Sequence, residues 1–269
     1  MKNSLILYAL LASFAALSAC GNKLDPNATQ SGENVGNLSV SYNEVNNTLT
    51  VTDGVVEYTY AQDSEGDNRA IAGFKRSSAD SRNDYALRGE TSSGSGEAFL
   101  VNSTENGYEA AATFLNRLET PNLPTSGTAS FSGDYSGVYF ANKEEDSVWW
   151  DIITGDVTLD ANFSDSTVSG SIINRDSVES GDLDNVTLSA SSISNGAFSG
   201  TASGGGDGDG NYVASDGTYE GMFTGAVGSE VIGSINIPII SSEYAPNGGF
   251  EMGIFIAGED EGVIEEVTR

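Results

Sequence analysis

Residues 127–140 alternate between two kinds of position, and this alternation is the clearest structural pattern in the chain. One face carries Gly127, Ala129, Phe131, Gly133, Tyr135, Gly137 and Tyr139, and the other carries Thr128, Ser130, Ser132, Asp134 and Ser136. A period of two residues is typical of a half-buried β-strand. Large and small inward residues in turn suit the tapering interior of a small closed barrel. The stretch is long for one straight strand, so we expect a bend or a β-bulge at Gly133 and Asp134.

The same alternation returns in seven further stretches. They are residues 153–163, 168–172, 186–190, 198–202, 219–225, 231–237 and 250–256. In the last stretch the apolar face is formed by Phe250, Met252, Ile254 and Ile256. Asn195 and Gly196 separate two of the stretches and are a strong signal for a two-residue hairpin turn. The pattern predicts an all-β fold whose main part is an eight-stranded antiparallel up-and-down barrel.

A smaller β-rich region is predicted in front of the barrel, over residues 37–120. Alternating stretches occur at residues 38–42, 49–52 and 56–60, and short strands are also expected at residues 70–74 and 85–88. The segment 92–96 reads Ser-Ser-Gly-Ser-Gly and predicts a flexible turn or linker. Residues 108–118 fit a helix by propensity and a strand by alternation, and we favour the strand. Pro121 and Pro124 then mark a boundary, so the barrel domain is expected over residues 121–258.

The N-terminus has the pattern of a bacterial lipoprotein signal peptide. Lys2 precedes an apolar run over residues 5–17, which is too short to cross a bilayer because a spanning helix needs about 20 residues. Leu-Ser-Ala-Cys follows and resembles a lipobox, with Cys20 as the lipidated residue. The alternative is an ordinary signal peptide with a chance cysteine. We therefore predict removal of residues 1–19 and attachment of diacylglycerol and a fatty acid such as palmitate to Cys20.

The lipid anchor defines the expected ends of the folded part. Residues 20–36 have no periodicity and predict a flexible tether, and residues 259–269 predict an acidic tail. Cys20 is the only cysteine, so a disulfide framework is excluded. Gly21 stands where an aspartate would signal inner-membrane retention in enteric bacteria. By that resemblance the outer membrane is the expected location.

Charge and composition exclude several function classes. The chain carries 39 acidic and 11 basic residues, a formal net charge of −28, and no histidine. Nucleic acid and anionic lipid surfaces would repel such a surface. The commonest general base and the commonest zinc or haem ligand are missing as well. We therefore predict a protein that is not an enzyme and holds no cofactor besides the lipid on Cys20.

Three motifs resemble one family of bacterial surface lipoproteins. Phe-[Ser/Thr]-Gly recurs at residues 131–133, 198–200 and 223–225. The last copy belongs to a phenylalanine-glycine strand, a short turn, a glutamate and a second glycine-containing strand, at Phe223, Gly225, Glu230 and Gly233. This arrangement resembles the β-barrel domain of transferrin-binding protein B and of factor H-binding protein. Gly228 and Ile232 depart from the family pattern, which has alanine and glycine there.

The resemblance implies a fold, a location and a class of function. It implies a barrel preceded by a handle-like β region, anchored in the outer membrane and carried to the cell surface by a lipoprotein translocator. It also implies a non-catalytic binding module for a protein or small solute, with a link to iron uptake. The alternative is a structural or adhesive surface lipoprotein without a dedicated ligand. Nothing in the chain matches the transferrin-contacting loops of the family.

Candidate binding residues lie near one end of the predicted barrel. Trp149 and Trp150 follow an acidic tip at residues 143–147, and neighbouring strand residues face opposite sides. One tryptophan should therefore lie outside the barrel, either on a binding surface or against the N-terminal domain. We add Tyr139, which ends the inward face of the first barrel strand, to this candidate surface.

Two other groups of residues give weaker signals. Asp207, Asp209 and Asn211 place oxygen ligands at alternate positions, as calcium loops do, but Thr218 stands where such a loop needs its glutamate. A solvated hairpin loop fits better, so no metal site is predicted. Acidic pairs such as Asp156 and Asp160 are expected by chance in so acidic a chain and predict no glycosidase site.

Overall fold

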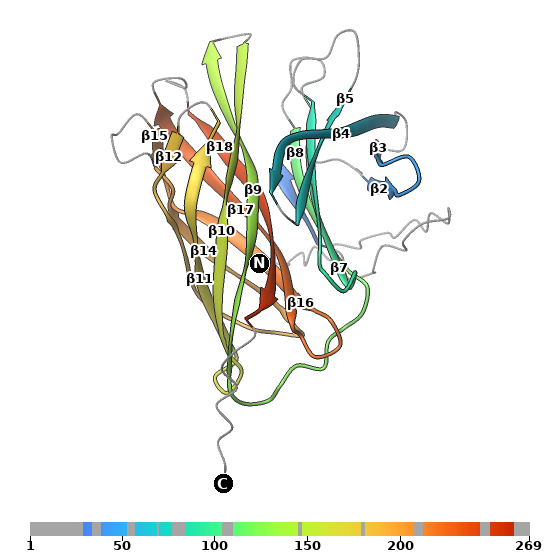
Figure 1. Ribbon diagram of the computed structural model, residues 1–269. Helices are drawn as coiled ribbons and strands as arrows, with labels where there is room; N and C mark the ends of the chain where they lie inside the picture. The colour runs from blue at the N-terminus through green and yellow to red at the C-terminus, as the bar shows by residue number, and fades with distance from the viewer. Residues whose placement is uncertain are drawn as a thin grey trace, which may run out of the picture.

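The computed structural model describes the chain in ten segments. They are residues 29–33, 39–52, 57–68, 70–76, 84–103, 110–144, 147–178, 181–206, 212–242 and 248–260. These segments form two antiparallel sheets that lie side by side, a barrel and a smaller handle (Figure 1). They contain no helix, and so none long and apolar enough to cross a membrane.

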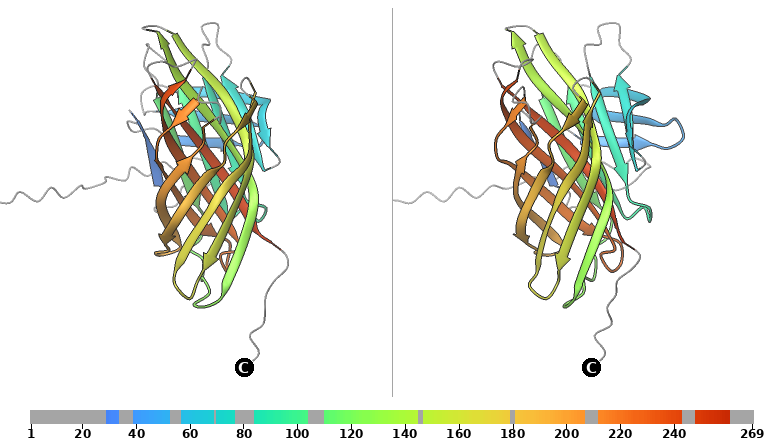
Figure 2. Two further views of the ribbon diagram at one scale, coloured as in Figure 1. Left: turned by 90° about the vertical axis from the view of Figure 1, so that its left-hand side faces the viewer. Right: turned by 60° about the vertical axis from the view of Figure 1, so that its left-hand side comes forward.

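Eight long strands form the barrel wall. They are β9 (Thr128–Glu144), β10 (Ser147–Asn162), β11 (Thr167–Ser177), β13 (Val186–Ser192), β14 (Ala197–Gly204), β16 (Gly217–Thr224), β17 (Glu230–Ser242) and β18 (Gly249–Glu259). Each strand pairs with its neighbours in an antiparallel ladder, and the pairings of β18 with β9 and of β10 with β11 close the wall. The predicted eight-stranded antiparallel barrel is confirmed (Figure 2).

Two short strands extend this wall rather than adding to it. β12 (Gly181–Leu183) pairs with β11 just beyond β13, and β15 (Tyr212–Ala214) pairs with β17 just beyond β16. A β-bulge at Gly133 and Asp134 is excluded, because the register of β9 with both neighbours runs through these residues without a shift. Barrel strands run obliquely to the axis, which accommodates a long continuous strand.

Aromatic rings fill the barrel and lie on bare backbone of neighbouring strands. Phe255 covers Gly233, and Tyr135 covers Gly253, so that a methyl group at either glycine would overlap the ring. The interior forms one buried apolar cluster that reaches from Phe131 to Ile239. The alternation of rings and glycines in the sequence thus lets a ring on one strand pack over a glycine on the next strand.

The two ends of the barrel differ in their connections. At the lower end, where β9 begins, tight turns at residues 163–166, 193–196 and 225–229 join the strands. Asn195 and Gly196 form the expected two-residue turn, with positive φ angles of 52° and 72°. At the upper end the β9–β10 hairpin reaches beyond the other strands (Figure 1).

The handle is a second sheet of eight strands. They are β1 (Thr29–Glu33), β2 (Ser39–Asn43), β3 (Thr48–Thr52), β4 (Glu57–Asn68), β5 (Ile71–Arg76), β6 (Tyr85–Glu90), β7 (Gly96–Ser103) and β8 (Ala110–Arg117). Their order is β1-β8-β7-β6-β5-β4-β3-β2. Tyr42 of β2 contacts Phe74 of β5 at a ring distance of 5.9 Å, so the sheet curls back over its own face. β1 lies inside the segment 20–36 for which we expected a tether.

The strands β6, β7 and β8 are buried on both faces. One face joins the handle's own core, which includes Phe74, Phe99 and Val101. The other face joins a cluster shared with the outer wall of the barrel: Ile71, Tyr85, Leu87, Ala98, Leu100, Ala111, Leu115, Val138, Ile152, Met222, Ile232, Met252, Ile254 and Ile256. A strand buried on both faces has no apolar alternation, which explains why residues 108–118 were ambiguous. Within this stretch, Ala110–Arg117 forms a strand, as we favoured.

Candidate binding site at the upper end of the barrel

A β-bulge turns an arginine into the barrel near its upper end. The register of β10 with β11 shifts opposite Asn174, which has a positive φ of 52° and donates to Asp156 Oδ2 at 2.8 Å. A bulge re-aims the side chains that follow it. Arg175 consequently points inward and its side chain is fully buried. Gly155 and Gly205 leave the space that the guanidinium group and its stem occupy.

Arg175 is held by a buried carboxylate. Its Nη2 donates to both oxygens of Glu251, at 2.6 and 2.5 Å, and its Nη1 donates to the backbone carbonyl of Asp184. Tyr135 donates its hydroxyl to Glu251 Oε1 at 2.6 Å. Burial, and next the Glu251 charge, raise the pKa of Tyr135 well above its usual value, and Arg175 opposes them only in part. Tyr135 therefore remains a hydrogen-bond donor throughout the physiological range.

The polar group closes the interior rather than opening it. Ser177 donates to Asp151 one step further up, and both residues are buried. Below them the apolar cluster fills the described part of the lumen. The described interior thus holds polar side chains bound to one another above an apolar cluster.

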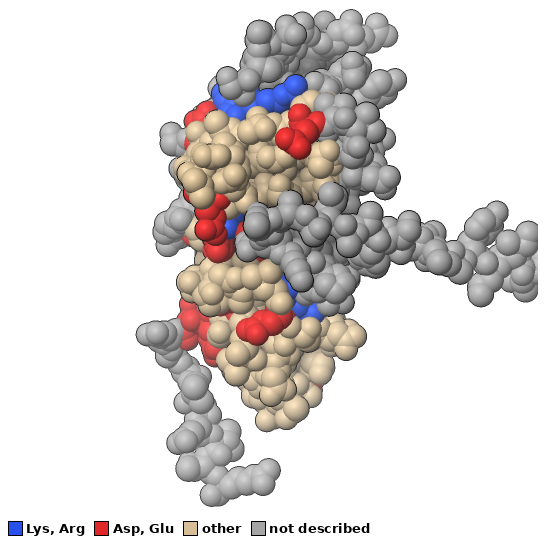
Figure 3. All heavy atoms as spheres, turned by 90° about the vertical axis from the view of Figure 1, so that its right-hand side faces the viewer, with Lys and Arg blue, Asp and Glu red and all other residues tan. Residues whose placement is uncertain are grey.

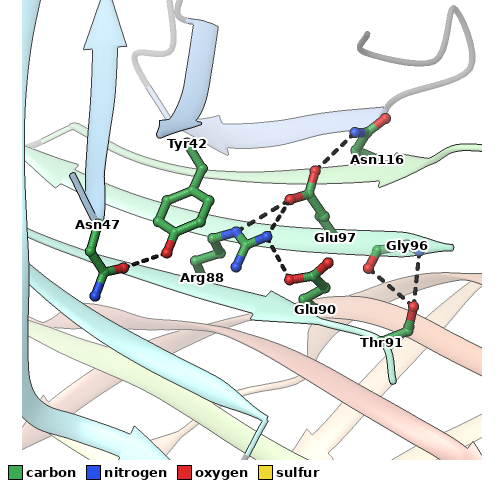
Figure 4. Close-up of polar contacts among 8 residues, drawn as sticks. All are labelled: Tyr42, Asn47, Arg88, Glu90, Thr91, Gly96, Glu97 and Asn116. Carbon is green, nitrogen blue, oxygen red and sulfur yellow. Dashed lines mark hydrogen bonds and ion pairs between the residues drawn. The ribbon is translucent and has the colours of Figure 1, made fainter. Parts of the chain in front are cut away.

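A second polar group lies inside the curled handle. Arg88 stacks on the ring of Tyr42 at 3.9 Å and pairs with Glu97 at 2.6 Å and Glu90 at 2.7 Å (Figure 4). Asn116 donates to the other oxygen of Glu97. Burial alone would lower the pKa of Arg88, but its contacts with Glu97 and Glu90 raise it above the usual value. These contacts connect β2 to β6 and β7 and so stabilise the curled sheet.

The handle is clamped to the lower end of the barrel through Glu230. Its carboxylate accepts hydrogen bonds from the Ser92 hydroxyl at 2.7 Å, the Ser93 amide at 3.0 Å, the Ser93 hydroxyl and the Ser95 hydroxyl at 2.9 Å. Burial by itself would raise the pKa of Glu230, but these hydrogen bonds lower it below the usual value. Of the two predicted forms of residues 92–96, a turn or a linker, the structure shows the turn, and it encloses a carboxylate of the other sheet.

Two further side chains, Arg117 and Asp134, join handle and barrel through hydrogen bonds. Arg117, at the end of β8, donates to the carbonyls of Asn195 and Gly196 at 3.2 and 3.3 Å. Asp134 of β9 accepts from the Ala70 amide at 2.8 Å. With the shared apolar cluster, these contacts make the handle and the barrel one continuous structure.

The predicted binding residues have different positions in this arrangement. Tyr139 is buried in the interior cluster with 3 % of its surface exposed. Trp149 and Trp150 belong to β10, where the backbone register pairs them with Ala141 and Phe140. Their side chains lie outside the described part of the structure, so a binding role for them stays a prediction.

Several other predictions also fall outside the described residues. Cys20 and the candidate calcium ligands Asp207, Asp209 and Asn211 are among them. Within the described segments no group of three or more acidic, histidine or cysteine residues could hold a metal ion.

Sequence reasoning missed the buried pair of Arg175 and Glu251. We assigned the apolar face of the last strand to Phe250, Met252, Ile254 and Ile256. That face in fact packs against the handle, and Glu251, Gly253 and Phe255 face the interior. The sequence does contain a signal, because residues 121–260 carry only two basic residues, Lys143 and Arg175.

The class of protein follows from this architecture: a filled antiparallel barrel with a curled β handle on its wall. The family model of the C-lobe and N-lobe β-barrels of Tf-binding protein B matches residues 123–258. That match covers half of the chain, and the chain belongs to this family. A comparison with curated proteins finds no significant match.

Several solved structures are similar to the chain. Isotype 1 transferrin-binding protein B of serogroup B Neisseria meningitidis is 19% identical with a TM-score of 0.45, over 82% of this chain and 41% of that one. A double mutant of the Haemophilus parasuis Hp5 protein is 14% identical with a TM-score of 0.49, over 86% and 44%. The lactoferrin-binding protein B N-lobe of Moraxella bovis is 10% identical with a TM-score of 0.39, over 87% and 99%. The chain thus spans less than half the length of the first two.

Proposed function

We propose that this protein is a lipid-anchored binding module of the outer membrane that captures a protein partner without catalysis. The observation that carries the proposal is the match of residues 123–258 to the barrel family of Tf-binding protein B. The lipobox-like sequence before Cys20 supports the anchor. In this proposal a surface lipoprotein translocator presents the folded part to the outside of the cell.

The filled interior supports a protein partner over a solute held inside the barrel. Arg175, Glu251 and Tyr135 occupy the upper lumen, and the aromatic cluster occupies the rest of its described part. A rigid scaffold that carries loops at one end is a common arrangement for binding. The upper end, with the reaching β9–β10 hairpin, is the place where we expect the principal contacts.

A non-catalytic role is supported by the chemistry of the chain. Histidine is absent, and the buried Arg175, Glu251 and Tyr135 bind one another rather than an open space. Asp156 and Asp160, the acidic pair considered above, bind Asn174 and Ser130 on the outer wall. These carboxylates hold surface turns and strands, which is a structural use.

The anchor and the orientation are tested on cells. Radioactive palmitate should label the wild-type chain but not Cys20→Ser, and protease added to intact cells should degrade the folded part. Palmitate label on Cys20→Ser would contradict the proposed anchor. A folded part that resists protease on intact cells and is degraded only after lysis would contradict the proposed exposure.

Binding is tested with the full chain carrying Cys20→Ser. Iron-loaded transferrin and lactoferrin, which the names of the similar proteins suggest, are passed over the immobilised chain. Saturable binding supports an iron-linked role. Partners are then sought by crosslinking on intact cells, and a surface without any saturable partner would favour the structural or adhesive alternative.

A further inference from the structure

A groove of about 250 Å³ lies on the wall of the barrel, across β14, β16 and β17. Its outward-facing lining consists of Ser199, Thr218, Glu220, Ser234 and Asn236. The strand register places Ser199, Glu220 and Ser234 in one row, with Thr218 and Asn236 in the next row up. Next below comes the row of Met222 and Ile232, which is covered by the handle. The groove therefore begins where the handle contact ends.

The chemistry of the groove is that of a hydrogen-bond acceptor with one negative charge. Glu220 is half-buried, and the Ser234 hydroxyl donates to its Oε1 at 3.4 Å, which is a weak hydrogen bond. Hydroxyl and amide oxygens surround it. No basic side chain is among the lining residues.

The rest of the barrel does not neutralise this charge. Of the two basic residues in residues 121–260, Arg175 is buried against Glu251, and Lys143 belongs to β9, which the groove does not touch. The chain as a whole has a net charge of −28. Figure 3 shows acidic groups scattered over the handle side, with basic groups along its upper edge and in smaller patches further down.

An exposed aliphatic surface continues the groove upward. Ile235, Ile237 and Ile239 of β17 belong to the interior cluster, so the residues between them face outward. Ile240 is 61% exposed, and Val213 on the paired strand β15 is 38% exposed. The six residue steps of β-strand from Ser234 to Ile240 span roughly 20 Å. The surface thus has a negative polar part and an apolar part at a fixed spacing.

We propose that this surface binds an extended, basic segment of a protein partner. A lysine or arginine side chain enters the groove and donates to Glu220, and an apolar residue further along the segment packs on Ile240 and Val213. This inference rests on the proposed binding function and gives it a second contact, on the wall below the upper loops. A charge-assisted hydrogen bond in a partly closed groove is stronger than one on an open surface.

Two other occupants fit the groove less well. A divalent cation needs several oxygen ligands of which more than one is charged, and Glu220 is the single carboxylate of the lining. A glycan is usually held by an exposed aromatic ring, whereas the ring of Tyr219 packs in the interior cluster with Phe198. A cationic side chain needs neither feature.

The inference is tested by NMR titration of the full, isotope-labelled chain carrying Cys20→Ser. The probe is an extended peptide with one lysine and one leucine six positions apart in a Gly/Ser/Thr background. Two control peptides have norleucine or glutamate in place of the lysine. We expect the lysine peptide to shift the backbone amides of residues 218–220 and 234–236, and the other two peptides to shift them far less.

Variants of the protein separate a specific site from general attraction. Glu220→Gln should weaken binding of the lysine peptide about tenfold, since a hydrogen bond to a charged group is lost. Glu259→Gln, at an exposed position of β18, changes the net charge equally and should leave the affinity unchanged. Ile240→Ser should weaken binding by a smaller factor.

Three results would overturn the inference. They are equal losses for Glu220→Gln and Glu259→Gln, equal affinity of the lysine and norleucine peptides, and shifts spread evenly over the acidic surface. Failure of the inference is distinguishable from failure of the proposed function. If a partner found on cells binds Glu220→Gln as tightly as the wild type, the module stands and only the groove is excluded.

Discussion

At its lower end the barrel is closed by aromatic rings, whereas at its upper end it is closed by an ion pair. Phe223 packs edge-on against Phe131 and Phe198 at ring distances of 5.6 and 5.5 Å. Arg175 and Glu251 form the corresponding plug near the upper end. The lower end has tight turns and is clamped to the handle through Glu230, while the upper end has a bulge and a reaching hairpin.

The difference shows how stability and recognition are divided along one barrel. Close-packed apolar side chains stabilise the fold without the cost of burying a charge. Such packing suits the lower end, where the barrel is also clamped to the handle. A buried ion pair contributes little net stability, because desolvation offsets its attraction. The ion pair does fix the relative positions of the strands that carry the upper loops, where we propose that the partner binds.

The largest effect is expected from breaking the upper plug. Arg175→Met leaves Glu251 buried without its cation, which should lower the free energy of unfolding by about 3–5 kcal/mol. The double variant Arg175→Met/Glu251→Leu should recover most of that loss, because neither charge is then buried alone. Urea denaturation of the full chain measures both. An Arg175→Met variant as stable as the wild type would show that the upper end does not depend on the pair.

A smaller loss is expected from overfilling the lower half. A methyl group at Gly233 would overlap the ring of Phe255, so Gly233→Ala should cost about 1–3 kcal/mol through strain in the packed interior. Gly258→Ala is the matched control, because no atom lies within 4 Å of the methyl group it adds. If both substitutions had equal effects, the ring-on-glycine packing would not be what stabilises this half.

The clamp on Glu230 should show itself through pH. Glu230→Gln is expected to cost about 1.5 kcal/mol at neutral pH, since hydrogen bonds to a charged group are weakened. The pKa of Glu230 is lowered in the folded state, so its contribution is complete above the ordinary value of about 4.3 and is lost as the pH falls through the folded-state value. The stability difference between wild type and Glu230→Gln should therefore shrink below about pH 4.

The control for the clamp lies at the same end of the barrel. Glu259→Gln removes an exposed carboxylate and should leave the pH profile of unfolding close to that of the wild type. A profile for Glu230→Gln that stayed parallel to the wild type at every pH would contradict a charged clamp.

The smallest effect is expected at the bulge. Asn174 has a positive φ, a conformation that costs most residues about 1 kcal/mol but glycine little. Asn174→Ala should therefore lower the free energy of unfolding by about 1 kcal/mol, and Asn174→Gly by clearly less. Denaturation curves of the two variants give the comparison. Equal losses for the two variants would mean that the hydrogen bond to Asp156, which both remove, holds the bulge and that the backbone conformation does not.

The sequence was sufficient to predict the barrel because its interior face obeys a simple rule. Glycines alternate with rings or aliphatic side chains on this face, and each of the eight predicted stretches overlaps a barrel strand. The rule failed on β18, where the more regularly apolar face is the outer one, because that face meets the handle. Periodicity alone cannot tell the inside of a barrel from a covered outer wall.

The candidate site was harder to predict because its contacts join residues far apart in the chain. Arg175 faces inward only because a bulge at Asn174 shifts the alternation by one position. Glu230 fixes the serine-rich turn at residues 92–95 across a separation of more than 130 residues. Composition marks such a turn as mobile, and only the opposing carboxylate makes it rigid.

The sheet face shared by handle and barrel has a consequence for how this molecule can be divided. Met222, Ile232, Met252 and Ile254 are almost completely buried, and it is the handle that covers them. A barrel without the handle would expose this apolar surface to water and would tend to self-associate. Fragments for crystallisation or immunisation should therefore keep both sheets, because the handle covers the apolar outer surface of the barrel.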